Sequence, residues 1–568
     1  MKPRTEALRE IAERQFDVCV IGAGATGAGC ALDAQLRGLE TVLLDSGDFA
    51  SATSGASTKL AHGGVRYLQE AVKDFDFAQL KVVRQALRER ILMLKNAPHL
   101  AHPLEFVVPC FSRFELLYYA LGMKVYDWIA GKGKLADSRV LSPAEALHHI
   151  PALKTDHLAG AVAYQDGQFD DARYGVTLVK TFANASGAVA NYLRVASFEK
   201  DAGGKLVAAV AEDTLAQQQI RVRARVFVNA TGPFSDGVRS LASPRALSRL
   251  VLSRGVHILL PLDGDVSSAL LIPKTEDGRV IFAIPWLGRL LVGTTDQETT
   301  LENELVVTRA EAEYLLRHLN RYSIRPHTID EIVSGFAGIR PLVRARHSQQ
   351  TKNLIREHEV EVDEGSGLIS ILGGKWTTYR AMAEDTIDVA HRRLGGPIRQ
   401  SSTQHHALAG GAGYSLEHWK SLARDYQLDE STARHLATKF GTDAAAVLDM
   451  TKDRPELKAP VVRGAAPIEA EVVYCIREEM AVTIEDVLSR RLGLQQFGWK
   501  LAIQAAPVVA SHLAKELGWP ERQKNEAIQR YVSKIDRSLA AIGTPDDSIR
   551  PREDAESESA GQRVGKGG

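Results

Sequence analysis

A strand, a glycine-rich turn and a helix near the N-terminus constrain the fold more than any other feature of this chain. Residues 16–21 form a short apolar run that leads directly into GAGATG at positions 22–27, a GxGxxG spacing. Glycines at these positions allow a tight turn, close approach of the backbone to a pyrophosphate, and packing of the following helix on the sheet. Because the helix N-terminus then faces the anion, Gly22, Gly24 and Gly27 predict a dinucleotide site.

The segment after this helix strengthens the prediction. A second apolar strand, residues 40–44, ends at Asp45, where an acidic side chain can accept hydrogen bonds from a ribose. A glycine-rich turn without a ligand is the alternative interpretation. The order of strand, glycines, helix, strand and terminal acid disfavours it, because GxGxxG alone is a weak signal and the full order is a strong one.

Composition indicates a large globular enzyme and excludes some partners. The 568 residues are 45% hydrophobic and 25% charged, which is ordinary usage for a globular protein. Lys plus Arg and Asp plus Glu number 70 each, so the formal net charge is zero. Without an overall positive field we expect no nucleic-acid partner, and local basic clusters must bind any anion.

Cysteine spacing and hydropathy indicate the compartment. The four cysteines show no CxxC spacing, and two fall in the nucleotide-binding unit, so we expect reduced core thiols. They are Cys19, Cys30, Cys110 and Cys475. No apolar stretch approaches the ~18 residues of a membrane-spanning helix, and residues 1–14 are charged without the apolar core of a signal peptide. The expected location is cytoplasmic, which leaves binding to a membrane surface open.

Further strand-like segments predict a second sheet. They lie at residues 159–164, 189–196, 220–229, 257–260, 280–285 and 290–293. Strands outnumber helices over this part of the chain, which favours a mostly antiparallel sheet inserted between the halves of the nucleotide-binding domain. Near residue 370 the pattern returns to strand, glycines and helix. The expected fold class is α/β, a Rossmann-like domain with an inserted substrate sheet and a helical C-terminal domain.

The C-terminal part of the chain has a different pattern. Gly-Gly pairs and polar residues over 395–414 are typical of a linker, and helical patterns dominate from there to about residue 541. We predict a discontinuous FAD-binding and substrate domain over 16–395 and a helical domain over 414–541. Residues 544–568 are polar and nearly free of large apolar groups, so we expect a disordered tail.

Two later segments favour FAD over a nicotinamide cofactor. The strand at 227–229 runs into ATGP at 230–233, whose small residues allow close approach to a cofactor that already lies across the first turn. An ordinary strand and turn is an equal alternative for this segment alone. Gly373-Gly374-Lys375 then opens a helix whose N-terminus can stabilise negative charge on a reduced isoalloxazine ring. Three such elements spread over the chain predict FAD.

Six motifs carry a resemblance to a known family. They are STKLAHGGVRYL at 57–68, DDAR at 170–173, NATGP at 229–233, GTTD at 293–296, GIRPL at 338–342 and GGKWTTYR at 373–380. On these motifs the chain resembles the FAD-dependent glycerol-3-phosphate dehydrogenases, within the D-amino-acid-oxidase-like flavoproteins, and residues 471–491 resemble the helical cap of that family. The resemblance implies oxidation of sn-glycerol 3-phosphate to dihydroxyacetone phosphate, with electrons passed from FAD to a quinone.

The resemblance also implies which residues contact FAD. In addition to Gly22, Gly24, Gly27 and Asp45, the implied cofactor-binding residues are Ser57, Lys59, His62, Gly63, Gly64, Val195, Ala230, Gly232, Gly374 and Thr377.

The implied substrate is a small phosphorylated polyol, and its dianion needs several fixed cations. Arg66, Arg340, Arg356 and Lys375 fall in segments that resemble the substrate side of the family, and Tyr67 can add a hydroxyl. A lone arginine is usually a solvated surface residue, so the position within a motif is what distinguishes these cations from others. A half-buried core tyrosine is the alternative for Tyr67.

Oxidation of the substrate requires a base for its hydroxyl proton, and histidine has a suitable pKa. His62 and His257 lie in matching segments. We prefer His257 as the catalytic group beside Arg340 and Lys375, although it begins an apolar strand and can instead be a core histidine. His62, next to Gly63, can instead contact the flavin. No HExxH motif or cysteine cluster predicts a metal.

The segment 111–134 mixes apolar, aromatic and basic residues. It can lie in a bilayer interface or form a core helix with a basic end. The quinone acceptor of the family favours the first, so the expected location is peripheral, on the inner face of the cell membrane. A homodimer is considered as an assembly state, although the sequence does not determine it.

Three other functions compete with a quinone-linked dehydrogenase. The first is an oxidase of the same substrate that reduces oxygen, and the second is a related amine oxidase. The third is a flavin-binding protein without turnover. Arg340, Lys375 and His257 together argue against the third, because a pure binding protein needs no phosphate pocket beside the flavin.

Overall fold

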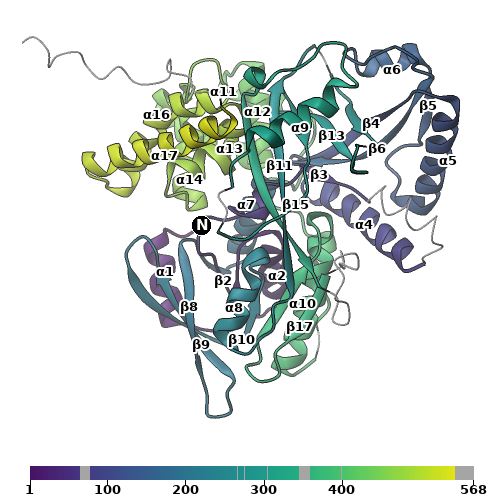
Figure 1. The fold of residues 1–568 in the computed structure, drawn as a ribbon. Helices are drawn as coiled ribbons and strands as arrows, with labels where there is room; N and C mark the ends of the chain where they lie inside the picture. The colour runs from purple at the N-terminus through teal and green to yellow at the C-terminus, as the bar shows by residue number, and fades with distance from the viewer. Residues whose placement is uncertain are drawn as a thin grey trace, which may run out of the picture.

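The structure is a computed structural model that describes residues 1–63, 77–264, 266–273, 275–302, 305–344, 358–397 and 399–543. Within these ranges the strands form one sheet of eight and one of ten. Figure 1 shows the eight-stranded sheet in the lower half, the ten-stranded sheet at the upper right and the C-terminal helices at the upper left.

The eight-stranded sheet contains the predicted nucleotide-binding unit. β1 (Gln15–Ile21) lies between β2 (Thr41–Leu44) and β10 (Gln218–Asn229), and β18 (Ile369–Gly373) lies beside β10, all in parallel. Parallel strands covered on both faces need apolar side chains throughout, which explains the continuous apolar runs. Since parallel strands end at the same edge of a sheet, the turns after β1, β10 and β18 converge there.

Helices from three distant segments cover this sheet. α2 (Ala25–Leu36), which follows the glycine turn, packs against α10 (Tyr379–Leu394) and α7 (Asp171–Asn184). Small residues such as Ala28 and Ala31 on α2 are completely buried in the core that these helices share with β1 and β10. The close packing of α2 on the sheet holds its N-terminus at the carboxyl edge.

The remaining strands of this sheet correct one prediction. They are β7 (Ala188–Ala190), β8 (Leu193–Lys200), β9 (Leu206–Asp213) and β17 (His358–Val362). The single strand predicted over 189–196 is wrong, because Asn191 and Tyr192 separate β7 from β8. Tyr192 has a left-handed φ of 53°, and here the chain leaves β2 to pair with β9.

The ten-stranded sheet is the predicted second sheet. Its pairs are antiparallel except for β4 with β12. In chain order its strands are β3 (Leu60–Ala61), β4 (Ala101–Cys110), β5 (Arg139–Leu141), β6 (Gly160–Phe169), β11 (Leu250–Pro261), β12 (Ala269–Ile272), β13 (Ile281–Trp286), β14 (Arg289–Gly293), β15 (Gln297–Glu298) and β16 (Ser334–Val343). These strands alternate along the chain with those of the first sheet, which confirms the predicted α/β fold class with an inserted, mostly antiparallel sheet.

The C-terminal helices pack on this second sheet. They are α11 (His418–Tyr426), α12 (Glu430–Phe440), α13 (Ala444–Asp453), α14 (Glu469–Glu479), α15 (Leu494–Phe497), α16 (Trp499–Leu517) and α17 (Glu521–Ile542). Apolar residues of α14 and α16, such as Val472 and Trp499, share one core with Val256 and Ile258 of β11. The domain boundaries at 395, 414 and 541 stay predictions, and the expected tail at 544–568 lies outside the described residues.

The short segment between α14 and α15 begins with reciprocal capping. Thr483 Oγ1 accepts from Asp486 N, and the Asp486 carboxylate accepts from Thr483 N, the arrangement of a capping box. Residues 486–491 then form a π-helix, which the sequence did not predict. Such local widening is common at functional positions, and it places Arg490 and Arg491 side by side.

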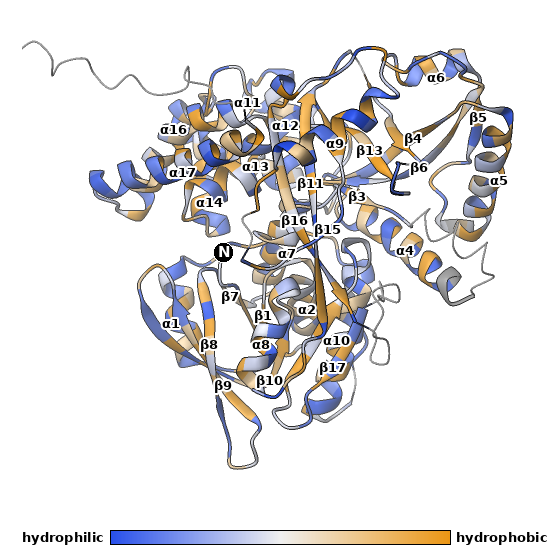
Figure 2. Ribbon diagram, viewed as in Figure 1, coloured by the Kyte–Doolittle hydropathy of each residue, from blue (hydrophilic) through white to orange (hydrophobic). Residues whose placement is uncertain are grey.

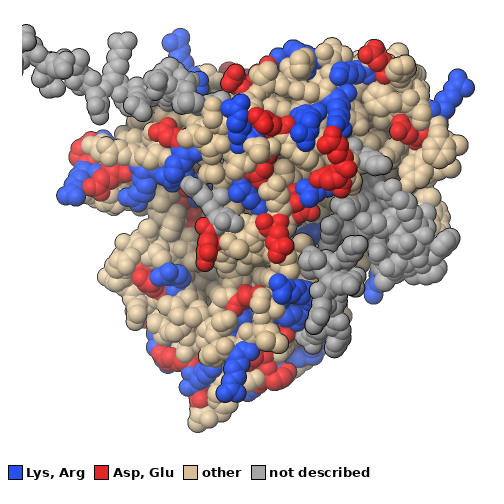
Figure 3. All heavy atoms as spheres, viewed as in Figure 1, with Lys and Arg blue, Asp and Glu red and all other residues tan. Residues whose placement is uncertain are grey.

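Helix α5 (Arg113–Ala130) exposes several large apolar side chains on its surface. It buries Met123, Tyr126 and Ile129, whereas Phe114 and Trp128 are 78% and 77% exposed. Figure 2 places α5 at the outer right edge, far from the C-terminal helices. Figure 3 shows basic and acidic residues interspersed on the visible face. Among the described residues, no helix is long and apolar enough to cross a bilayer.

Candidate functional site

The turn after β1 has no room for side chains. Gly22 has a φ of 101°, and a Cβ there would lie 2.7 Å from Ala230 O, while a Cβ at Gly27 would overlap Gly22 O. The turns after β1 and β10 are therefore in direct backbone contact. Gly24 is the N-cap of α2 and has no side chain to satisfy the first N–H groups, which leaves this helix end suited to an anion. These features fit the pyrophosphate of FAD.

Asp45 lies directly beside this turn. Its carboxylate accepts from Ala23 N at 2.6 Å and from Gly47 N at 2.9 Å. Burial raises the pKa of Asp45 to about 6, and the two N–H donors oppose this shift. The acid is thus at the carboxyl edge where the sequence predicts it, and its contact with a ribose stays a prediction.

The segment between β2 and β3 crosses from the first sheet to the second. Ser54 Oγ accepts from Ala25 N at 2.9 Å, and Ser54 O accepts from Trp376 Nε1 at 2.8 Å. Thr53 Oγ1 donates to Ile339 O of β16 at 2.6 Å. One short segment therefore contacts the glycine turn, the turn after β18 and the second sheet.

Lys59 holds this segment from within. Its ammonium lies 2.5 Å from Asp171 Oδ1 and 4.7 Å from the centre of the Phe336 ring, and the side chain is completely buried. Asp171 Oδ2 also accepts from Ser57 N at 2.8 Å. Of the implied cofactor residues, Ser57 and Lys59 are thus engaged with α7, and their contact with FAD stays a prediction.

His257 and Arg340 lie on one face of the second sheet. His257 on β11 pairs with Phe336 on β16, and Ser253 pairs with Arg340, so with period-two alternation these side chains all point to the same face. His257 Nε2 lies 3.0 Å from Thr58 Oγ1, and the His257 and Phe336 rings stack with centres 4.9 Å apart. This face therefore meets the crossing segment.

Two glycines make room for the side chains of Arg340 and His257. A Cβ at Gly255 would overlap the Arg340 guanidinium, and one at Gly293 would overlap the His257 ring. Arg340 donates to Thr294 Oγ1 at 2.9 Å and to Thr295 O at 3.2 Å. The GTTD and GIRPL motifs thus meet at Arg340. The sequence analysis did not assign roles to Thr58, Gly255 or Thr294, although Thr58 and Thr294 lie in the quoted motifs.

His62 belongs to a second group of polar residues. His62 N donates to Thr377 Oγ1 at 3.3 Å, and Gly63 N donates to Tyr126 Oη at 3.1 Å. Burial lowers the pKa of His62; Asp166 opposes this shift, and Lys375 adds to it. The structure thereby brings His62, Thr377 and Lys375 to the same turn.

His257 is held neutral by its surroundings. Burial lowers its pKa well below the usual range, and the positive charges of Arg340 and Lys59 lower it further. Its Nδ1 atom is buried and has no hydrogen-bond partner within the described ranges. A neutral imidazole beside an arginine can accept a proton from a bound anion's hydroxyl group.

The other residues that the resemblance implies for the cofactor and the substrate have no contact, within the described part of the chain, that tests their role. Gly374 has a φ of 83°, and its missing Cβ leaves room for Met382; Gly232 begins the turn after β10 with a φ of 55°. Val195 is buried in β8. Gly64, Arg66, Tyr67 and Arg356 lie outside the described residues. Within the described ranges, no group of three His, Cys, Asp or Glu could hold a metal ion.

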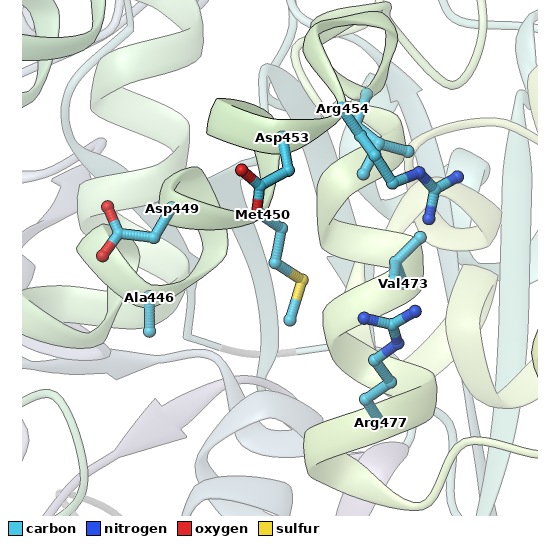
Figure 4. Close-up of a pocket in the computed structure, with 8 residues that line it drawn as sticks. Ala446, Asp449, Met450, Asp453, Arg454, Val473 and Arg477 are labelled. Carbon is cyan, nitrogen blue, oxygen red and sulfur yellow. The ribbon is translucent and has the colours of Figure 1, made fainter.

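A separate pocket lies in the C-terminal helical region (Figure 4), with a volume of about 300 Å³. Asp449 and Asp453 of α13 line one side, and Arg477 of α14 lines the other. Arg477 already pairs with Glu516 at 2.7 Å. None of the predicted site residues lines this pocket, and we assign it no ligand.

Comparison with known proteins defines the class of this site. Residues 17–380 match the family model described as FAD dependent oxidoreductase, and residues 401–524 match the C-terminal domain of alpha-glycerophosphate oxidase. The chain is therefore an FAD-dependent oxidoreductase by class, and the prediction of FAD is confirmed.

Individual relatives define the family. The mitochondrial glycerol-3-phosphate dehydrogenase of Homo sapiens is 41% identical over 530 residues, which cover 91% of this chain and 72% of that protein. The FAD complex of glycerol-3-phosphate dehydrogenase from Bacillus halodurans has a TM-score of 0.77 at 29% identity, with 96% of this chain and 98% of that chain covered. The chain belongs to the FAD-dependent glycerol-3-phosphate dehydrogenases, which confirms the resemblance. L-alpha-glycerophosphate oxidase from Mycoplasma pneumoniae, with a TM-score of 0.53, 16% identity and coverage of 68% of this chain and 97% of that chain, shares the fold alone.

Substitution of Gly27 tests the cofactor turn. In Gly27→Ala the new methyl group overlaps Gly22 O, so we expect the turn to open and bound FAD to fall at least about tenfold. The absorbance ratio of flavin to protein after gel filtration measures this content. Gly122→Ala in α5 is the matched control, because a Cβ there meets nothing within 4 Å. Equal FAD content in the two variants would contradict the assignment of the turn.

Proposed function

We propose that this protein oxidises sn-glycerol 3-phosphate to dihydroxyacetone phosphate and passes the electrons to a membrane quinone. The observation that carries the proposal is the placement of His257 and Arg340 on one sheet face, against the segment that also contacts the glycine turn. Family membership supports the substrate. FAD, when bound, supplies the two-electron acceptor for the hydride.

Arg340 is the proposed phosphate ligand. Its guanidinium is about one-third exposed, and Thr294 and Thr295 fix its orientation. A planar guanidinium held in this way can donate to two oxygens of a phosphate dianion. Lys375, beside His62, is the second proposed cation. Arg66, Tyr67 and Arg356 remain candidates from their motifs.

His257 is the proposed base. Burial, and to a smaller extent the charges of Arg340 and Lys59, lowers its pKa and keeps the imidazole neutral before the substrate arrives. When the phosphate dianion pairs with Arg340, its two negative charges oppose the effect of this cation, so the pKa of His257 rises and the imidazole becomes a better proton acceptor. Thr58 Oγ1 at 3.0 Å from Nε2 orients the ring. His62 is the alternative base.

An anaerobic titration tests the substrate. We expect glycerol 3-phosphate to bleach the flavin absorbance, and glycerol and glycine to leave it unchanged. Loss of the charge-assisted contact in Arg340→Ala removes roughly 1.5–3 kcal/mol, so the half-saturating concentration should rise about 10- to 100-fold while FAD is retained. Arg325→Ala, which removes an exposed arginine paired with Asp263 and Glu331, is the control. Bleaching by an amino acid would instead favour the amine oxidase.

The pH dependence of kcat/KM tests the base. This parameter reports the free enzyme, in which burial, Arg340 and Lys59 lower the pKa of His257. We therefore expect the acid limb of kcat/KM that His257 protonation causes to lie below about pH 6.5, the ordinary histidine value. Protonation of the substrate phosphate near about pH 6 adds a loss that all variants share.

His257→Gln should remove this acid limb and lower kcat about 10²- to 10⁴-fold, with FAD still bound. His62→Gln is the matched variant. If the acid limb persists in His257→Gln and disappears in His62→Gln, the proton acceptor is His62.

The exposed face of α5 supports a peripheral location. Apolar side chains at 114, 117, 121, 125 and 128 are exposed along one helix. Lys124 on this helix and Lys134 just after it pair with Asp127 and Asp137, and over residues 113–137 four basic residues outnumber three acidic ones. Apolar area combined with positive charge is typical of helices that bind an anionic bilayer surface. We propose that α5 brings the protein to the membrane that holds the quinone, on the inner face of the cell membrane.

Flotation with anionic vesicles tests this proposal. Phe114→Ser with Trp128→Ser removes two large exposed apolar groups, so binding should weaken by about tenfold or more without loss of FAD. Leu247→Ser is the control, since Leu247 is 81% exposed elsewhere. Unchanged binding in the double variant would contradict the role of α5. Production of hydrogen peroxide as fast as quinone reduction would favour the oxidase.

A further inference from the structure

The loop that follows β2 is fastened to the C-terminal helical region. Asp48, in the middle of this loop, is completely buried. Its carboxylate accepts from Arg490 Nε at 2.5 Å, from Arg491 Nη2 at 2.9 Å and also from Arg491 Nη1. Asn191 Nδ2 donates to the same carboxylate at 3.3 Å. Both arginines come from the π-helix at 486–491, more than four hundred residues further along the chain.

The same loop contacts the glycine turn on both sides of Asp48. The Asp45 carboxylate accepts from Ala23 N at 2.6 Å, and Ala50 N donates to Ala23 O at 3.1 Å. Ala50 adopts a left-handed φ of 55° to do so, a conformation that non-glycine residues hold only when the surroundings fix it. The position of Ala23, between Gly22 and Gly24, thus depends on the conformation of residues 45–50.

We propose that Arg490 and Arg491 are positioning residues for FAD: by fixing Asp48 they hold the 45–50 loop against the glycine turn, so that the C-terminal region contributes to cofactor retention without touching the cofactor.

The geometry of the arginines supports this role. Arg491 Nη2 donates to Glu479 O at 2.8 Å and Arg491 Nη1 to Asp486 O at 3.2 Å, so its guanidinium is held by the helix backbone. Arg490 Nη2 pairs with Asp486 at 2.6 Å. Burial alone would raise the pKa of Asp48, but Arg491 and Arg490 hold it at about 2. The loop therefore stays attached through a permanently ionised carboxylate.

Two variants of this cluster and one control test the proposal. Asp48→Asn and Arg490→Met each break the attachment of the loop. Lys439→Met is the control: Lys439 is also buried, and its ammonium donates to Asp170 Oδ2 at 2.5 Å. This pair joins α12 to the residue before α7, and neither partner belongs to the 45–50 loop or to the π-helix. The three variants are thus matched as losses at buried ion pairs between distant segments.

The readouts are the FAD dissociation constant, from the fluorescence of released flavin, and the thermal stability of each holoenzyme. We expect Asp48→Asn and Arg490→Met to raise the dissociation constant at least about tenfold, and Lys439→Met to change it less than about threefold even where it lowers stability. Arg490→Lys, which keeps the charge, should lie between the wild type and Arg490→Met.

The direction in which Asp48→Asn and Arg490→Met change FAD affinity distinguishes positioning from a purely electrostatic role. The Asp48 charge raises the pKa of Asp45 and the Arg490 charge lowers it, so electrostatics alone would make the two variants shift FAD binding in opposite directions. Positioning predicts weaker binding in both. Opposite shifts, unchanged binding, or an equal loss in Lys439→Met would overturn the proposal.

The inference depends on FAD binding at the glycine turn and not on the substrate. The Gly27→Ala variant tests that assignment by itself. If Gly27→Ala loses FAD while Asp48→Asn and Arg490→Met retain it, the turn is assigned correctly and only the role of the two arginines fails.

Discussion

Buried ion pairs at the start of α7 hold the main parts of this molecule together. Asp171 pairs with Lys59 of the crossing segment, Asp170 pairs with Lys439 at 2.5 Å, and Arg173 pairs with Glu479. Three residues within positions 170–173 thus connect the cofactor sheet, the crossing segment and the C-terminal helices. Removing one partner of such a buried pair commonly costs about 3–5 kcal/mol, since the other charge is left uncompensated. The three ion pairs fix three segments relative to each other. This positioning, more than any net gain in stability, is their effect on the fold.

Much of the fold could be predicted because its signals are local. β1, β18 and the last four residues of β10 are buried in parallel pairs, and each leaves an apolar run followed by glycine or small residues. The division of 189–196 into β7 and β8 could not be predicted, because it depends on Asn191, whose side chain donates to Asp48 and to Met480 O. Both partners are distant in sequence. Arg490 and Arg491 of the π-helix at 486–491 contact the same Asp48, which is equally distant from them.

The candidate site shows the same division. The motifs identified His257, Arg340 and Lys375 as candidates, and the structure brings the first two to one sheet face. What the motifs could not show is the register of β11 against β16, which decides that Gly255 lies under the Arg340 guanidinium. Nor could they show that Lys59 is paired with Asp171, since a buried lysine in a motif is equally suited to a cofactor or to an ion pair.

The alternation of the two sheets along the chain has a consequence for synthesis. β1 emerges first, but its sheet is completed only by β18 at residues 369–373, after most of the second sheet has been made. The loop beside the glycine turn receives its buried arginines later still, at positions 490 and 491. Because the eight-stranded sheet cannot close before residue 373 has been made, the nascent chain must keep its early apolar strands exposed on the ribosome. Assembly of the flavoprotein is thus expected to be largely post-translational, with a need for chaperones during elongation.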